Sequence, residues 1–199
     1  MGLREILGEI ITLFAIVNPI GALSIIDRIA PNMNPQKRTK VFNHAVITGA
    51  FILILFSFIG KAILEEVFHL SINDFLIAAG LILLVISIKS IVFHRFTKQE
   101  MDSFVVKDFG SFPVAFPLLV GPGALVAGVL TLQKHGLPAT IFIIVCVFCL
   151  VFFVLRFMDN FVKILGPLGL RVISKIMYVF LGAIAVKYII NGVVNYFKV

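Results

Sequence analysis

The sequence contains six long apolar runs, and each is long enough to cross a lipid bilayer as a helix. A spanning helix needs about 20 apolar residues to cross roughly 30 Å of hydrocarbon. We place the runs near residues 5–30, 43–66, 72–93, 112–132, 139–158 and 170–194. Backbone polar groups must be paired within lipid, and the runs are much longer than barrel strands. The sequence therefore predicts an all-α integral membrane protein with six transmembrane helices.

Composition agrees with a chain that resides in lipid. Of its 199 residues, 60% are hydrophobic and 14% are charged, and the mean hydropathy is +1.12. A soluble domain of this length has about a quarter of its residues charged. The first run carries Glu5 and Glu9 near its start, unlike a cleaved signal peptide. We therefore expect residues 1–199 to form a single membrane domain.

The distribution of basic residues predicts the orientation, because Lys and Arg are retained on the cytoplasmic side. One side of the predicted bundle carries Arg28, Lys37, Arg38, Lys40, Arg95, Lys98, Lys107, Arg156, Lys163, Arg171 and Lys175. The other side carries Arg4, Lys61, Lys134 and Lys198. This asymmetry predicts a cell (inner) membrane protein with both termini outside. Basic loops beside anionic lipid account for the net charge of +7, so no nucleic-acid partner is expected.

Two short motifs recur in corresponding runs of the two halves. The motif "NPIGAL" at 18–23 returns in altered form as "GPGAL" at 121–125, and "ISIK" at 86–89 is matched by "IAVK" at 184–187. Each half contains three runs, so the second half enters the membrane from the opposite side. The sequence thus predicts two inverted three-helix repeats, about 1–95 and about 110–199. Secondary transporters with this plan bind solutes where the broken helices of the two halves meet.

Proline predicts a break in the first helix of each half. Pro19 and Pro122 lack the amide hydrogen that a helix interior needs, and their rings collide with the carbonyl four residues earlier. The residues before them, Asn18 and Gly121, are pushed away from helical angles. We therefore expect both helices to stop and restart within the membrane, at NPIG and at GPG.

The backbone groups where each helix restarts are expected to bind a ligand. Gly21 and Gly123 permit backbone conformations that other residues resist. Free amide hydrogens near Ala22 and Ala124, together with the helix dipole, would favour an anionic group, and the freed carbonyls of the first half-helix would suit an ammonium group or a small cation. The candidate substrate-binding residues are Asn18, Pro19, Gly21, Ala22, Gly121, Pro122, Gly123 and Ala124. The alternative is a pair of proline kinks that serve packing alone.

The positions of the acidic residues narrow the class of solute that the protein could transport. All ten lie in loops or near the ends of the runs, so no carboxylate is expected at the membrane centre to pair with an organic cation. A small neutral or zwitterionic solute fits better. Four residues are candidates for coupling or gating: Glu9 as a proton carrier, Ser24 in a sodium site, and Lys89 and Lys187 in gating. For Glu9 and the two lysines, the alternative is a long side chain that reaches the nearest interface.

Other chemistry has weaker support in the sequence. Cys146 and Cys149 form a CxxC pair in the fifth run, but a redox transporter needs a thiol in the broken helix of each half, and a cysteine in a buried apolar helix is unreactive. The four histidines lack metal-ligand spacing, and no nucleophile or phosphate-loop motif occurs. We expect no catalytic residue, metal or cofactor other than a coupling proton or sodium ion. A membrane scaffold or partner-binding protein, a membrane enzyme and a homo-oligomer stay open.

The chain resembles the MarC family of multi-pass membrane proteins through essentially its whole length. Four stretches carry the resemblance: "NPIGAL", "AAGLILLVISIK" at 78–89, "FPLLVGPGAL" at 116–125, and "LGPLGLRVISKIMYVFLGAIAVKYIINGV" at 165–193. Related members look like transporters of small neutral amino acids, so the resemblance implies the same class of solute and the same motif residues. The chain departs from the family pattern at Lys175, Tyr178 and Lys187, where Arg, Gly and Gln are usual.

Overall fold

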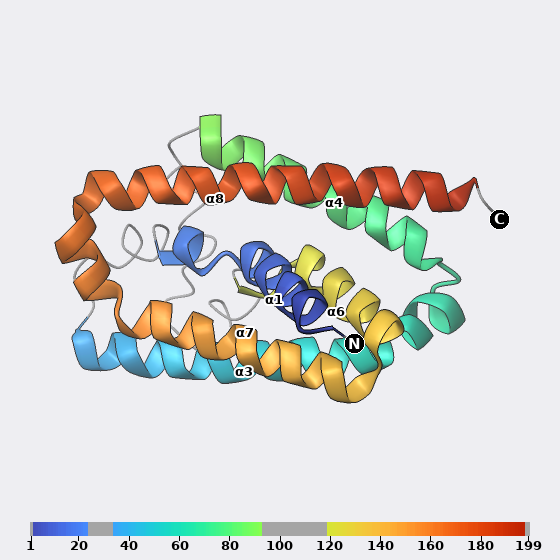
Figure 1. Cartoon of the computed structure of the whole chain (residues 1–199), viewed down its shortest axis with the longest axis horizontal. Coiled ribbons are helices and arrows are strands. Elements are labelled where there is room, and N and C mark those ends of the chain that lie inside the picture. Colours follow the sequence, from blue (N-terminus) through green and yellow to red (C-terminus); the bar gives the residue numbers. More distant parts are fainter. Residues whose placement is uncertain (1, 24–33, 93–118, 198–199) are drawn as a thin grey trace.

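The computed structural model describes residues 2–23, 34–92 and 119–197 (Figure 1). This part of the chain is helical and contains no strand. Its elements are α1 (Leu3–Val17), α3 (Pro35–Ala62), the short π-helix η1 (Ile63–Val67), α4 (Ile72–Val92), α6 (Pro122–His135), α7 (Leu137–Arg156) and α8 (Met158–Tyr196).

Five helical segments are long and apolar enough to cross a membrane. They are Leu3–Leu23, Arg38–Val67, Ile72–Val92, Leu137–Arg156 and Leu168–Tyr196. Five of the six predicted runs are thereby confirmed. The fourth, 112–132, begins outside the described residues, and α6 with its 14 residues covers only about 21 Å. The sixth crossing stays a prediction.

Helix starts follow from capping residues in the sequence. At α3 the Asn34 side-chain oxygen accepts a hydrogen bond from the Gln36 amide at 2.9 Å, and Pro35 takes the first helical position. At α4 the Ser71 amide donates to the Asp74 carboxylate at 2.9 Å, while the Asp74 amide donates to the Ser71 hydroxyl at 3.2 Å. Such reciprocal bonds satisfy amides that a helix start leaves unpaired.

Two glycines redirect the chain in the second half. Gly136, with φ 76°, separates α6 from α7, and Gly166, with φ 66°, interrupts α8. Both φ values are costly for a residue with a Cβ. Figure 1 shows α8 turning near its start and then running straight along the whole molecule.

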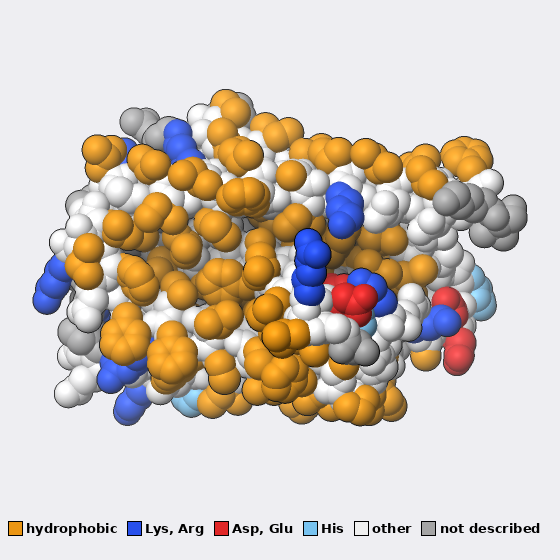
Figure 2. Space-filling view, viewed as in Figure 1, with side chains coloured by type: hydrophobic (Ala, Val, Ile, Leu, Met, Phe, Trp, Pro, Cys, Tyr) orange, Lys and Arg blue, Asp and Glu red, His pale blue; other side chains and the backbone are white. Residues whose placement is uncertain are grey.

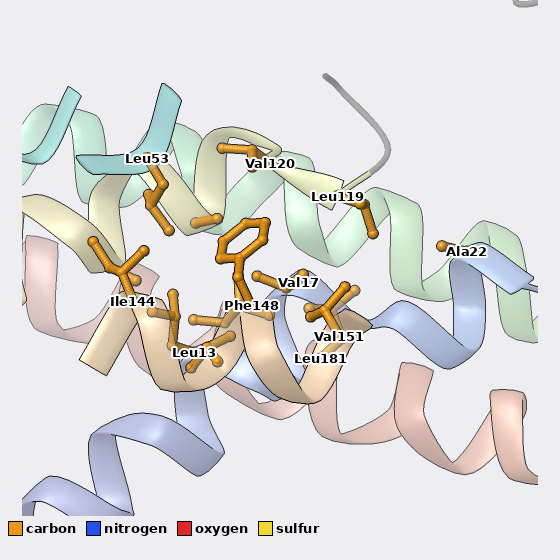
Figure 3. Close-up of a cluster of buried hydrophobic side chains, with 14 of the residues drawn as sticks. Leu13, Val17, Ala22, Leu53, Leu119, Val120, Ile144, Phe148, Val151 and Leu181 are labelled. Carbon is orange, nitrogen blue, oxygen red and sulfur yellow. The ribbon is translucent and has the colours of Figure 1, made fainter. Parts of the chain in front are cut away.

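The helices form three layers. In Figure 1, α4 and α8 lie on one side, α3 and α7 lie on the other, and α1 and α6 lie between them. Buried side chains from these elements form one apolar core. Figure 3 shows Leu13 and Val17 of α1 surrounded by Ile144, Phe148 and Val151 of α7.

Small residues let α4 and α8 approach closely. A Cβ at Gly80 would lie 2.8 Å from the carbonyl oxygen of Ala185, and one at Gly182 would lie 2.7 Å from the hydroxyl of Ser87. Gly192 similarly faces the start of α4, so the two helices run antiparallel. Glycine contacts of this kind are common where membrane helices cross.

The outer surface suits lipid. Figure 2 shows hydrophobic side chains over most of the visible face, with charged side chains gathered at a few places. Exposed large apolar residues occur along the whole of the long helices, such as Phe51 and Phe58 of α3 and Val179 and Phe180 of α8. A surface this apolar would be unstable in water.

Candidate functional site

The predicted break in the first helix is confirmed. α1 ends at Val17, and Asn18 adopts the left-handed conformation with φ 47° and ψ 59°. Its amide donates to the Phe14 carbonyl at 3.0 Å, which completes the last turn. The chain is helical again over residues 19–23. Asn18 therefore lies outside both helical segments, as the following proline requires.

Asn18 also begins the second helical segment. Its side-chain Oδ1 accepts a hydrogen bond from the Gly21 amide at 3.0 Å, and its carbonyl accepts one from the Ala22 amide at 3.1 Å. Pro19 takes the first position, where no amide hydrogen is needed. The expectation of a free amide at Ala22 is therefore wrong, because Asn18 caps the restarting helix.

The start of α6 repeats this arrangement without a capping side chain. Gly121 is extended, with φ −85° and ψ 177°, and Pro122 follows at the first helical position. The amides of Ala124 and Leu125 donate to the Gly121 carbonyl at 3.0 and 3.2 Å, so the expected free amide at Ala124 is also absent. The residues before 119 lie outside the described part, so an interrupted helix in the second half stays a prediction.

Close packing, rather than unusual backbone angles, explains the two motif glycines. Neither Gly21 nor Gly123 has a positive φ, so the expectation of special backbone freedom is wrong for both. A Cβ at Gly21 would lie 2.5 Å from the Asn18 Nδ2 and 2.7 Å from the Tyr178 hydroxyl. At Gly123 an added Cβ would collide with the side chain of Leu83.

Polar side chains of α8 reach the break in α1, and a serine of α4 bonds to the backbone of α8 at Tyr178. The Ser174 hydroxyl of α8 donates to the Ile20 carbonyl at 3.3 Å, and the Ser87 hydroxyl of α4 donates to the Tyr178 carbonyl at 2.5 Å. We call Asn18, Gly21, Ser87, Ser174 and Tyr178 the break cluster. All five are buried, with Asn18 only 6% exposed and Tyr178 8%.

Sequence reasoning missed two members of this cluster. Ser87 lies in the ISIK motif and Ser174 lies beside Lys175, and no feature of either stretch indicates that its hydroxyl bonds to another segment. Tyr178 was noted only as a departure from the family pattern. Its hydroxyl, however, lies directly beside the break.

The restart of the first helix and the start of α6 belong to one buried core. That core includes Ala22 and Leu23 from the first motif, and Leu119, Val120 and Ala124 around the second. Figure 3 shows Leu119 and Val120 in the same cluster as Val17 and Ala22. The structure thus brings together the two motifs that the sequence singled out.

Glu9, the candidate proton carrier, pairs with residues at the end of α6 and not with the break cluster. Glu9 accepts a hydrogen bond from Lys134 Nζ at 2.8 Å, and its carboxylate lies 3.3 Å from His135 Nε2. The hydrogen bond and charge of Glu9 hold the pKa of Lys134 above its usual range. Glu9 is thus an ion-pair partner that joins α1 to the end of α6, not a lone interfacial carboxylate.

The other candidates are less informative. Lys187 is exposed on α8, and Lys89 is half-buried near the end of α4. Neither belongs to the break cluster, and Ser24 lies outside the described residues.

Cys146 and Cys149 are free thiols on α7. The expectation that both are buried is wrong, because Cys149 is exposed. Within the described ranges, no three His, Cys, Asp or Glu side chains could hold a metal ion together.

Comparison with known proteins identifies the family. The family model described as MarC family integral membrane protein matches residues 3–197. A UPF0056 membrane protein of Pyrococcus abyssi is 29% identical over 188 residues, covering 94% of this chain and 93% of that protein. The UPF0056 membrane protein YhcE of Escherichia coli is 29% identical over 196 residues, covering 94% and 91%. No solved structure matches the chain significantly. The chain belongs to the MarC family of multi-pass integral membrane proteins.

Proposed function

We propose that the protein is a secondary transporter of a small neutral solute, with neutral amino acids as the first class to test. The observation that carries this proposal is the buried, left-handed break at Asn18, beside the Ser174 and Tyr178 hydroxyls of α8. Irregular backbone at membrane depth is tolerated only where it is buried in protein or lines a cavity. Transporters with broken helices use such positions to bind solutes near the midplane.

An inverted repeat with six crossings is part of this proposal, and a shared spacing supports it. The 102 residues that separate Gly21 from Gly123 also separate Gly80 from Gly182. Gly80 packs against Ile189, seven residues beyond Gly182, and Gly182 packs against Ser87, seven residues beyond Gly80. If each residue is replaced by its counterpart 102 positions away, the Gly80 contact becomes the Gly182 contact and the reverse also holds.

The charges of the described helices favour a neutral or zwitterionic solute. No carboxylate belongs to the break cluster, and of the two carboxylates on α1, Glu5 lies in the first turn and Glu9 is paired with Lys134. An organic cation would need a buried counter-charge. In contrast, the Asn18 amide and the Ser174 and Tyr178 hydroxyls at the break carry no charge, which favours a neutral polar group over an organic cation. Coupling to a proton or to sodium completes the proposal.

Uptake and counterflow of labelled glycine, alanine and serine in proteoliposomes test this function. We expect saturable flux in the wild type and its loss in Gly123→Leu, because the new side chain must displace Leu83 at the start of α6. Gly8→Leu is the matched control, since a Cβ at Gly8 meets nothing within 4 Å. Absence of flux for every small solute, under both proton and sodium gradients, would leave a membrane scaffold as the better description.

We also infer that the protein resides in the inner membrane with both termini outside. This inference rests on the basic residues of the connecting segments. In a Cys146→Ala, Cys149→Ala background, an impermeant maleimide should label Lys61→Cys in intact cells. Lys163→Cys should react only after permeabilisation. Both side chains are exposed at opposite predicted faces. The reverse pattern would invert the topology.

A further inference from the structure

The start of α8 is a short helical segment that lies between two membrane spans. Gly166, with φ 66°, interrupts α8, so residues 158–165 do not continue the span Leu168–Tyr196. We call residues 158–165 the connecting segment. The preceding span, Leu137–Arg156, ends directly before it. Figure 1 shows this segment crossing one end of the molecule, from α7 to the long straight part of α8. A helix that joins the ends of two consecutive spans lies at the membrane surface.

The connecting segment and its N-cap expose a stripe of apolar side chains. Four residues recur at the spacing i, i+4, i+7 and i+8, which places side chains on one face of a helix. They are Phe157, Phe161, Ile164 and Leu165. All four are exposed, and Ile164 is 80% exposed. Leu168 at the start of the next span is 72% exposed, so the stripe adjoins the apolar outer surface of that span. An apolar surface that continues a lipid-facing one indicates contact with lipid.

Basic side chains accompany the apolar stripe. Lys163 lies on the neighbouring face of the connecting segment, and Arg156 and Arg171 lie at the ends of the two adjoining spans. All three are exposed, and none pairs with a carboxylate among the residues that the structure describes. Asp159 is the single acidic residue in this stretch of the sequence. On the face drawn in Figure 2, Lys and Arg side chains occur at this end of the molecule, and no Asp or Glu side chain is visible there. The end is therefore complementary to an anionic surface.

We propose that the connecting segment lies flat in the membrane surface and binds anionic phospholipid headgroups through Arg156, Lys163 and Arg171. The apolar stripe inserts beside the upper parts of the acyl chains, and the three cations contact the headgroup phosphates. Amphipathic helices with Lys or Arg on the polar face bind membranes in this way. A lipid with no net charge would leave the three cations uncompensated, so anionic lipid is preferred. This inference does not depend on the transport function proposed above.

Quenching of a fluorescent probe by brominated lipids tests both parts of the inference. The full chain with Ile164→Cys, in a Cys146→Ala, Cys149→Ala background, is labelled with bimane and reconstituted in vesicles of phosphatidylcholine and phosphatidylglycerol. Bromine near the headgroup end of the acyl chain should quench more strongly than bromine near the methyl end. The association constant of phosphatidylglycerol relative to phosphatidylcholine should be at least about fivefold, since one Lys or Arg near the surface contributes about this factor. Added salt should reduce the preference.

Charge variants assign the preference to the named side chains. The double variant Arg156→Gln, Lys163→Gln should lower the relative association constant by about fivefold or more. Lys61→Gln is the matched control, because Lys61 is also exposed but lies at the end of α3, where it pairs with Glu65 at 3.8 Å. We expect no change in this control.

Three results would overturn the inference. Equal association of both lipids would remove the anionic preference. An equal loss in the double variant and in Lys61→Gln would show an effect of total charge rather than of this surface. A probe at Ile164→Cys that no brominated lipid quenches would show that protein covers the stripe, and excimer emission from pyrene at the same cysteine would then assign it to a second copy of the chain.

Discussion

Asn18→Ala is expected to lower the free energy of unfolding by about 3 kcal/mol. About 1–3 kcal/mol of this comes from leaving the buried Gly21 amide without an acceptor, and about 1–2 kcal/mol comes from forcing alanine into a left-handed conformation. Asn18→Gly loses the acceptor but tolerates φ 47°, so it should cost about 1 kcal/mol less than the alanine variant. Denaturant unfolding in detergent measures both values. Equal stability of wild type, glycine and alanine variants would contradict the capping role.

The same two variants should transport poorly even where they stay folded. Removal of one site hydrogen bond lowers flux by about tenfold, since a bond of this kind is worth about 1–1.5 kcal/mol. The proteoliposome assay should therefore show similar flux losses for Asn18→Ala and Asn18→Gly despite their different stabilities. Flux that follows stability alone, with Asn18→Gly close to wild type, would assign Asn18 to folding only.

Gly80→Ala is expected to destabilise the protein by about 1–3 kcal/mol, the usual cost of overpacking. The new Cβ would lie 2.8 Å from the Ala185 carbonyl oxygen and 3.1 Å from the Ile189 amide nitrogen. These are backbone atoms of α8, so no rotation of a side chain can relieve the contact, and α4 must move away from α8.

The matched control, Gly8→Ala, is not expected to destabilise the protein. Gly8→Ala places the same methyl group on α1 where nothing lies within 4 Å. Alanine is favoured over glycine inside a helix by about 0.5–1 kcal/mol, so this variant should be as stable as the wild type or slightly more stable. Thermal unfolding in detergent compares the two. Destabilisation of equal size in both variants would show that the α4 and α8 contact is not specific to Gly80.

The sequence predicted the features that depend on local physics. The break at Asn18 follows from the geometry of proline and its preceding residue. The five candidate membrane spans follow from apolar length. The amide expected to be free at Ala22 is paired, which local rules were sufficient to predict, since an Asn cap followed by proline leaves few amides unpaired. At Ala124 the amide is paired with the Gly121 carbonyl instead.

Contacts between distant segments could not be predicted in this way. Ser174 bonds Ile20 across 154 residues, and Lys134 pairs with Glu9 across 125 residues. Nothing in the sequence near Gly21 indicates that Tyr178 is its neighbour. The role of that glycine became clear only from helix packing, because close approach and backbone freedom both favour the same residue type.

The layered arrangement also determines which parts of the molecule can move as units. Each outer layer combines one helix from each half of the chain, α4 with α8 and α3 with α7. A displacement of one half against the other would separate both pairs and break the backbone contacts of Gly80 and Gly192. A displacement of one layer against the other preserves both pairs. Units that keep these contacts are therefore assembled across the two halves of the chain, and the break at Asn18 lies in the layer between them.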